Sequence, residues 1–234
     1  MFKLLLCYAT LCMSSCLLYS MFGLNQSEEA GFFDFLDILF FSGDAYPKEQ
    51  FQKGILGAML FFMIMLFGIL FCSSSANNFS HGMHHMELTR YEKYSRYFLA
   101  CNLKTAGEAL KYTVMTALLP LGIVFAKPTA LTKFTSMTGD PLVGDIFGTV
   151  LFFIKFFMLI MVLELILFTI TRKQGYTTAL IYILIASALL IITDWQLKTG
   201  FITMGKTLNQ LIAVLIYAVI FSALCILFRR EPKE

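Results

Sequence analysis

Long apolar runs alternate with short polar stretches along the whole chain. Six windows each hold roughly 20 mainly apolar residues, the length that a helix needs to cross the hydrocarbon core of a bilayer. They span residues 4–23, 54–72, 109–126, 146–170, 176–193 and 209–228. The runs lack the alternation of barrel strands, and backbone polar groups in lipid must be bonded within their own segment. We therefore expect an all-α integral membrane protein, with residues 1–234 forming one domain of six transmembrane helices.

Composition agrees with the membrane prediction. Of the 234 residues, 58% are hydrophobic and only 14% are charged, and the mean hydropathy is +0.75. These values lie well outside the range of ordinary soluble domains. The formal net charge is a modest +3. We expect the lipid bilayer to surround the chain, and no nucleic acid among its partners.

The positions of lysine and arginine predict how the helices cross the membrane. If six helices cross, the side that holds the amino terminus receives eleven of these residues: Lys3, Arg90, Lys93, Arg96, Lys104, Lys111, Arg172, Lys173, Arg229, Arg230 and Lys233. The opposite side receives six: Lys48, Lys53, Lys127, Lys133, Lys198 and Lys206. Because basic residues are enriched in cytoplasmic loops, we expect a multi-pass protein of the cell membrane with both termini in the cytoplasm.

The first apolar run and the loop after it need separate interpretation. Residues 1–16 resemble a secretory signal, with a charged start, an apolar stretch and small residues. The apolar run continues to Phe22, so we expect an uncleaved first span, with cleavage as the alternative. Residues 31–41, GFFDFLDILFF, are too short and too charged to cross. We expect them to form an interfacial or re-entrant helix against the bundle.

Residues 200–207, GFITMGKT, match the phosphate-binding loop pattern, with Lys206 and Thr207 at the positions that contact phosphate and magnesium. A working loop of this kind joins a buried strand to a helix in an α/β domain. Here the pattern falls in a short connection that the expected topology places outside the cell, away from ATP. We interpret the match as accidental and expect no ATPase site in this chain.

Three histidines, His81, His84 and His85, are the weak candidates for metal ligands, because three imidazoles on one helical face could hold zinc. Gly82 weakens a helix there, and no carboxylate stands at the spacing of a general base. The six cysteines show no paired spacing, and the chain has no nucleophile elbow or zinc-protease pattern. We expect surface histidines, no metal or cofactor in this chain and no enzyme activity, with a membrane-embedded metal-dependent enzyme as an alternative.

Two ionisable residues, Lys155 and Glu164, lie inside the fourth apolar run. Ionisable groups within a membrane are functional candidates by default. They are nine residues apart, which at about 100° per residue places them on opposite sides of a helix, so they cannot pair along it. We expect each to take part in structural pairing with other helices instead of contact with a substrate.

Residues 87–112, ELTRYEKYSRYFLACNLKTAGEALKY, form the longest charged, helix-forming stretch. One aromatic face repeats at helical spacing: Tyr91, Tyr94, Tyr97 or Phe98, and Cys101. We expect residues 87–104 to form an amphipathic helix in the membrane interface. After a break at residues 102–104, Thr105 and Glu108 read as a capping box that begins the third span.

Part of this stretch, YEKYSRYFLACNLKTAGEALKY, resembles a segment of the small ABC-2 type permeases of bacterial peptide exporters, such as the exporters of phenol-soluble modulins. The residues that fit the outline of that segment are Glu92, Lys93, Tyr94, Arg96, Tyr97, Lys111 and Tyr112. Asn102 stands where those permeases usually have proline, and the Ser-Arg pair that follows their proline is missing. The motif covers about a tenth of the chain.

The resemblance implies the permease subunit of an ATP-driven ABC exporter, which moves a peptide, lipid-like or other amphipathic substrate by alternating access. It implies a cytoplasmic coupling helix between the second and third spans. The residues implied to contact a separate ABC-type ATPase subunit are Glu92, Lys93, Tyr94, Arg96, Tyr97 and Phe98. That partner would bind ATP and Mg²⁺, and the permease would form a homodimer or a heterodimer with a similar chain. A non-transporting accessory or immunity protein of the same topology is the alternative.

Overall fold

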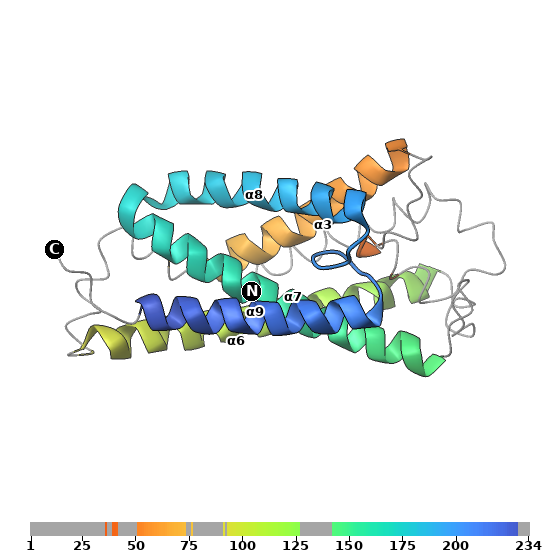
Figure 1. The fold of residues 1–234 in the computed structure, drawn as a ribbon. Coiled ribbons are helices and arrows are strands. Elements are labelled where there is room, and N and C mark those ends of the chain that lie inside the picture. Colours follow the sequence, from red (N-terminus) through yellow and green to blue (C-terminus); the bar gives the residue numbers. More distant parts are fainter. Residues whose placement is uncertain are drawn as a thin grey trace.

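The computed structural model describes residues 36, 39–41, 51–73, 76, 91, 93–126 and 142–228, without the side chains of residues 51–53, 119–126, 142–145 and 228. Five long helices make up most of this part: α3 (Phe51–Cys72), α6 (Tyr94–Ala126), α7 (Leu142–Gln174), α8 (Tyr176–Leu197) and α9 (Thr207–Phe228). They run along one another in alternating directions (Figure 1). The described residues contain no strand, which confirms the all-α class.

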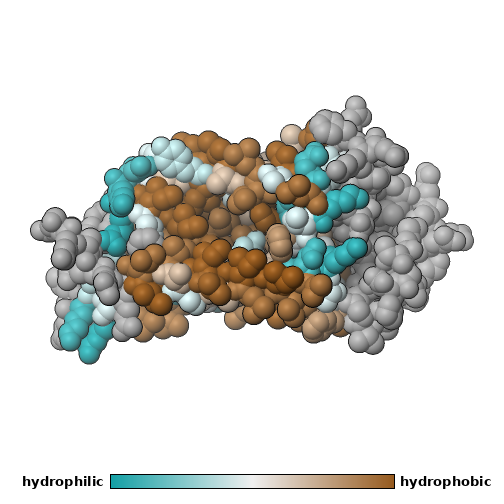
Figure 2. All heavy atoms as spheres, in the orientation of Figure 1, coloured by the Kyte–Doolittle hydropathy of each residue, from teal (hydrophilic) through white to brown (hydrophobic). Residues whose placement is uncertain are grey.

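Four of these helices are long and apolar enough to cross a membrane. The spans are Gly54–Cys72, Ile146–Gln174, Tyr176–Leu197 and Thr207–Leu227, and they coincide with the second, fourth, fifth and sixth predicted runs. Figure 2 shows hydrophobic side chains across the middle of one face and hydrophilic ones toward its ends, as expected of a protein in a bilayer. The first predicted run lies outside the described residues, and the third falls in the C-terminal part of α6.

Helix α7 is the centre of the bundle. It packs against α3, α6, α8 and α9, and 67% of its most apolar window is buried, compared with 11% in α9. Its membrane-spanning part has 29 residues and is about 44 Å long at ~1.5 Å per residue. Because this length exceeds the hydrocarbon thickness of roughly 30 Å, α7 must tilt. Figure 1 shows it crossing α9 at an angle.

Helices α7 and α8 are joined by one residue, Gly175, whose φ of 85° lies in the left-handed region that favours glycine. From this hairpin α8 follows one side of α7, while α9 returns along another side. Between α8 and α9 lies an apolar groove of about 490 Å³, and residues of α7 form its bottom. Its lining includes Leu163, Leu190 and Ile216.

Helix α6 corrects the prediction of a separate interfacial helix. It runs without interruption from Tyr94 to Ala126, so the predicted break at residues 102–104 is wrong. The predicted capping box is wrong as well, because Thr105 and Glu108 lie in the helix interior. Leucine, alanine and lysine, which favour helix continuation, are frequent in this stretch.

The described part of the segment at residues 31–41 lies against the bundle. Leu36, Leu39, Phe40 and Phe41 are each at most 1% exposed. The ring of Phe40 lies 4.7 Å from that of Phe152, and the ring of Phe41 lies 5.8 Å from that of Trp195. These contacts add an apolar layer beside the end of the bundle where α8 ends.

Gly54 allows α3 to approach α8 closely, and we expect Gly54→Ala to lower the melting temperature of the purified protein. A Cβ atom at this position would lie 2.3 Å from Cζ2 of Trp195, so the indole or the whole helix must move. Gly107→Ala is the matched control, because its added Cβ meets nothing within 4 Å, and helical Ala is favoured over Gly by about 0.5–1 kcal/mol. Equal melting shifts for the two variants would contradict the close packing of α3 on α8.

Candidate functional site

The loop between α8 and α9, residues 198–206, is organised by the carboxylate of Asp194. This side chain belongs to the last turn of α8 and is 3% exposed. Five donors meet at its two oxygens: the amides of Phe201, Ile202 and Thr203, at 2.8–3.0 Å, and the hydroxyls of Thr199 and Thr203. The carboxylate is thus solvated by the loop in place of water.

Lys155 of α7 is completely buried beneath the same loop. Its Nζ donates hydrogen bonds to the carbonyl oxygens of Thr203 at 2.6 Å and Gly200 at 2.9 Å, and it lies 5.0 Å from the ring centroid of Phe152. Asp194 supplies the opposite charge that acts on Lys155. Carbonyl dipoles and one carboxylate therefore balance the ammonium charge, and Lys155 ties the loop to the central helix.

The two glycines of the GFITMGKT pattern close this loop on itself. Gly200 has a φ of 66°, in the region that favours glycine. A Cβ at Gly200 would lie 2.6 Å from Cα of Gly205, and one at Gly205 would lie 2.5 Å from Cα of Gly200. The loop joins two helices, not a strand and a helix, and Lys206 is exposed. Loop closure accounts for both glycines without any bound phosphate.

Side chains of α9 fix the loop from its other side. Asn209 donates to the carbonyl of Thr199 at 2.7 Å, and the Tyr217 hydroxyl donates to the carbonyl of Phe201 at 3.0 Å. Gln210 donates to the carbonyl of Gly205. Helices α7, α8 and α9 all bind the loop, so this end of the bundle is held by polar contacts as well as by apolar packing.

Glu164 of α7 faces a different neighbour, helix α6. It is 5% exposed, and its Oε1 atom has no hydrogen-bond partner among the described residues. It lines a small cavity of about 10 Å³ together with Ala76, Phe98, Cys101, Asn102, Thr105, Met161, Leu165 and Phe168. As the nine-residue spacing predicts, Lys155 and Glu164 do not meet: one turns to the α8–α9 loop and the other to α6.

The residues predicted to contact an ATPase divide into two sets on α6 and just before it. Tyr94, Tyr97 and Phe98 are buried at 8%, 1% and 4% exposure, whereas Lys93 and Arg96 are exposed. Glu92 lies outside the described residues. These three aromatic side chains therefore belong to the core of the bundle, and of the described residues in the predicted set only Lys93 and Arg96 are exposed to a partner.

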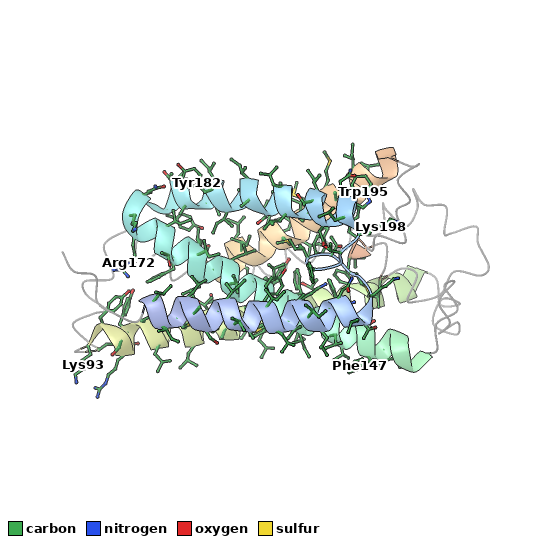
Figure 3. The ribbon with its side chains drawn as sticks, viewed as in Figure 1. Lys93, Phe147, Arg172, Tyr182, Trp195 and Lys198 are labelled. Atoms are coloured by element: carbon green, nitrogen blue, oxygen red, sulfur yellow. The ribbon has the colours of Figure 1, made fainter. Side chains whose placement is uncertain are left out.

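The buried aromatic set attaches the start of α6 to the end of α7. Nη1 of Arg172 donates to the Tyr94 hydroxyl at 2.6 Å, and the Arg172 guanidinium lies 5.2 Å from the Tyr94 ring centroid. The Phe98 ring lies 6.2 Å from that of Phe168. Figure 3 shows Lys93 and Arg172 at one end of the bundle and Trp195 and Lys198 at the other. We call the end that holds Lys93, Arg96, Arg172 and Lys173 the basic end.

The part of the chain that the structure describes contains no group of three His, Cys, Asp or Glu residues that could hold a metal ion. The candidate ligands His81, His84 and His85 lie outside that part. Cys72 and Cys225 are free thiols.

Asp194 is the residue that the sequence interpretation missed. Its position at the end of an apolar run made it look like the first residue of an outer loop. The signal was nevertheless present, because the segment after it is rich in threonine and glycine, at Thr199, Gly200, Thr203 and Gly205. Residues of these types supply hydroxyls and unobstructed amides to a carboxylate.

The apolar helices and the polar groups near their ends define a multi-pass α-helical membrane protein. Comparison with known protein families, with curated proteins and with solved structures found no match to this chain. The resemblance to ABC-2 permeases therefore depends on the motif at residues 91–112 and on the layout of the helices.

Proposed function

We propose that this chain is the membrane subunit of an ATP-driven exporter of the ABC type, and that a separate ATPase subunit binds at the basic end. The observation that supports this best is the continuity of α6. One rigid helix carries the charged residues at its start and then packs against α7 at the cavity of Glu164. A push on the exposed start of α6 would reach the membrane interior without passing through a flexible joint.

The docking face in this proposal contains fewer residues than the motif, because only exposed side chains can contact the ATPase subunit. Arg96, Leu99 and Leu103 follow one another at helical spacing and are exposed, with Leu99 at 60% and Leu103 at 66% exposure. A stripe that combines one cation with apolar side chains suits a protein partner, because charge sets orientation and apolar contact supplies energy. Lys93 is also exposed and extends the stripe beyond the start of α6.

The groove between α8 and α9 favours an amphipathic cargo. Its volume is about 490 Å³, and its lining is apolar apart from Thr193, Asp194, Thr199 and Tyr217. The three of these that belong to α8 or the loop, Thr193, Asp194 and Thr199, lie where α8 ends. A lipid-like or peptide cargo could place apolar groups along α7 and a polar group near the α8–α9 loop.

The remaining features of the proposal follow from the sequence. The chain has six spans with both termini in the cytoplasm, and it works as a homodimer or with a similar chain. ATP and Mg²⁺ are bound by the ATPase subunit. Alternating access between the two permease chains moves the cargo outward.

The test is ATP hydrolysis by the complex purified from its native membrane through a tag on this chain. We expect a co-purified ATPase, and we expect the double variant Arg96→Glu, Leu99→Asp to lower hydrolysis at least tenfold, about 1.4 kcal/mol of coupling. The matched control, Lys206→Glu, Leu208→Asp, makes the same kinds of change at two exposed residues of the opposite end and should keep full hydrolysis.

Two results would contradict the proposal. One is purification of the intact chain without any protein that hydrolyses ATP. The other is unchanged hydrolysis and unchanged co-purification in the Arg96→Glu, Leu99→Asp variant. A loss of ATP binding in the Lys206 variant alone would instead restore the phosphate-binding interpretation of residues 200–207.

A further inference from the structure

The carboxyl group of Glu164 is buried, and one of its two oxygens lacks a hydrogen-bond partner among the described residues. A carboxylate offers about four acceptor sites, and leaving a charge unpaired away from water costs several kcal/mol. Oε1 has no hydrogen-bond partner among the described residues. Asp194 on the neighbouring helix shows the contrast, because five donors satisfy its two oxygens.

The groups around Glu164 favour its neutral form. Phe98, Met161, Leu165 and Phe168 make most of the cavity apolar. Its two neutral polar neighbours among the described residues are Asn102 and Thr105, three residues apart and therefore on one face of α6. The side-chain oxygens of both can accept a hydrogen bond from a protonated carboxyl group.

The charges that the structure describes near the cavity give an ionised Glu164 no support. Glu108 of α6 is the charged group that acts on it, and it carries the same sign. Within the described part of the chain, the other titratable neighbours are the thiols of Cys72, on α3, and Cys101, on α6. No described residue places a cation against Glu164.

The size of the cavity limits what it can hold. Its volume is about 10 Å³, close to the smallest space that admits one water molecule. A divalent cation requires about six or more oxygen ligands, whereas among the described lining residues only three side chains carry oxygen. The site has room for a proton on the carboxyl group and one bridging water.

We propose that Glu164, with Asn102 and Thr105, forms a proton-binding site inside the membrane, which exchanges protons with the basic end of the bundle. Glu164 lies ten residues before Gln174, the last residue of α7, which is about 15 Å along the helix. The route to it passes Cys101 and Asn102, which are only partly buried. This site does not depend on the ATPase partner proposed above.

Proton release changes the contact between α6 and α7. The neutral carboxyl group packs in the cavity and donates one hydrogen bond toward α6. The ionised group needs water around it, and the cavity has room for a single molecule, so α6 and α7 must separate to admit more. The proton is therefore a ligand that favours the closed α6–α7 contact.

The test uses the purified full chain without any partner and dicyclohexylcarbodiimide as the probe. This reagent reacts with protonated carboxyl groups: the acid proton moves to one nitrogen, the carboxyl oxygen adds to the central carbon, and the acyl group then migrates to nitrogen. At about pH 7, exposed carboxyl groups with a pKa near 4.3 are ionised and unreactive. We expect mass spectrometry to find the adduct on Glu164, none in Glu164→Gln, and an unchanged adduct in the control Lys206→Ala, at an exposed residue of the opposite end.

Infrared spectroscopy covers the case in which the reagent does not enter the cavity. At neutral pH the difference between wild type and Glu164→Gln should show the C=O stretch of a protonated acid, and this band should shift in D₂O. Absence of both the adduct and the band would overturn the proposal. Protection from labelling by sodium chloride but not by choline chloride would also overturn it, because a bound sodium ion would then be the occupant.

Discussion

Replacing Asp194 by Asn is expected to destabilise the end of the bundle that holds the α8–α9 loop. The amide has one acceptor oxygen, and its NH₂ group would face backbone amides that also donate, at Ile202 and Thr203. Lys155 would lose the negative charge that acts on it while staying buried. Leaving a buried charge without its compensating charge costs about 3–5 kcal/mol. We expect the free energy of unfolding to fall by this amount.

The measurement is thermal unfolding in detergent, followed by tryptophan fluorescence. Trp195 is the single tryptophan of the chain and directly follows Asp194, so it reports on this loop. Lys206→Ala, at an exposed residue of the same loop, should change stability by no more than about 0.5 kcal/mol. Adding Lys155→Met to Asp194→Asn should recover part of the loss, because the unbalanced charge is removed. Equal stability of Asp194→Asn and Lys206→Ala would show that the carboxylate does not hold the loop.

Tyr97→Ala is expected to destabilise the bundle itself. The ring is 1% exposed and lies 5.9 Å from that of Tyr91 and 6.3 Å from that of Tyr94. Removing a buried aromatic ring leaves a cavity and typically costs about 3–5 kcal/mol. We therefore expect a lower melting temperature in the purified chain even when no partner is present.

Two variants separate this effect from a role in binding. Tyr97→Phe keeps the ring and should retain most of the stability. Leu99→Ala, two residues along the same helix and 60% exposed, should leave the melting temperature nearly unchanged. If Tyr97→Ala melted like wild type but failed to bind an ATPase subunit, Tyr97 would belong to the docking surface and the assignment to the core would be wrong.

The sequence predicts the four spans of α3, α7, α8 and α9 well, because length and apolar composition are sufficient to recognise a membrane helix. It fails at α6, and the reason lies in Asn102 and Thr105. Polar residues next to an apolar run are typical of a helix end in the membrane interface, and the sequence interpretation placed a break there. In the structure these residues lie within one continuous helix and face the cavity of Glu164. One sequence cannot distinguish a polar residue that meets water from one that meets a buried carboxyl group on another helix.

For a related reason, the sequence predicted the buried charges of the candidate site but not the groups that bind them. Lys155 and Glu164 are conspicuous because a charge inside an apolar run is rare. The groups that bind Lys155 are carbonyl oxygens of Gly200 and Thr203, which lie 45 and 48 residues further along the chain. Backbone carbonyls belong to every residue and give no compositional signal, so their role becomes visible only when the loop is folded over α7.

The separation in sequence between Lys155 and the carbonyls that bind it affects how the chain is inserted during synthesis. When α7 first leaves the ribosome, the residues that will bind Lys155 do not yet exist, because Thr203 follows 48 residues later. An ammonium group without partners is costly in hydrocarbon. The part of α7 that carries Lys155 is therefore expected to stay at the membrane surface or in the translocon until these partners are made. The single-residue connection at Gly175 lets α7 and α8 enter together as a hairpin. The hydrogen bonds of Lys155 can form only when the loop before α9 has been made, so the central helix depends on a later part of the chain for its final contacts.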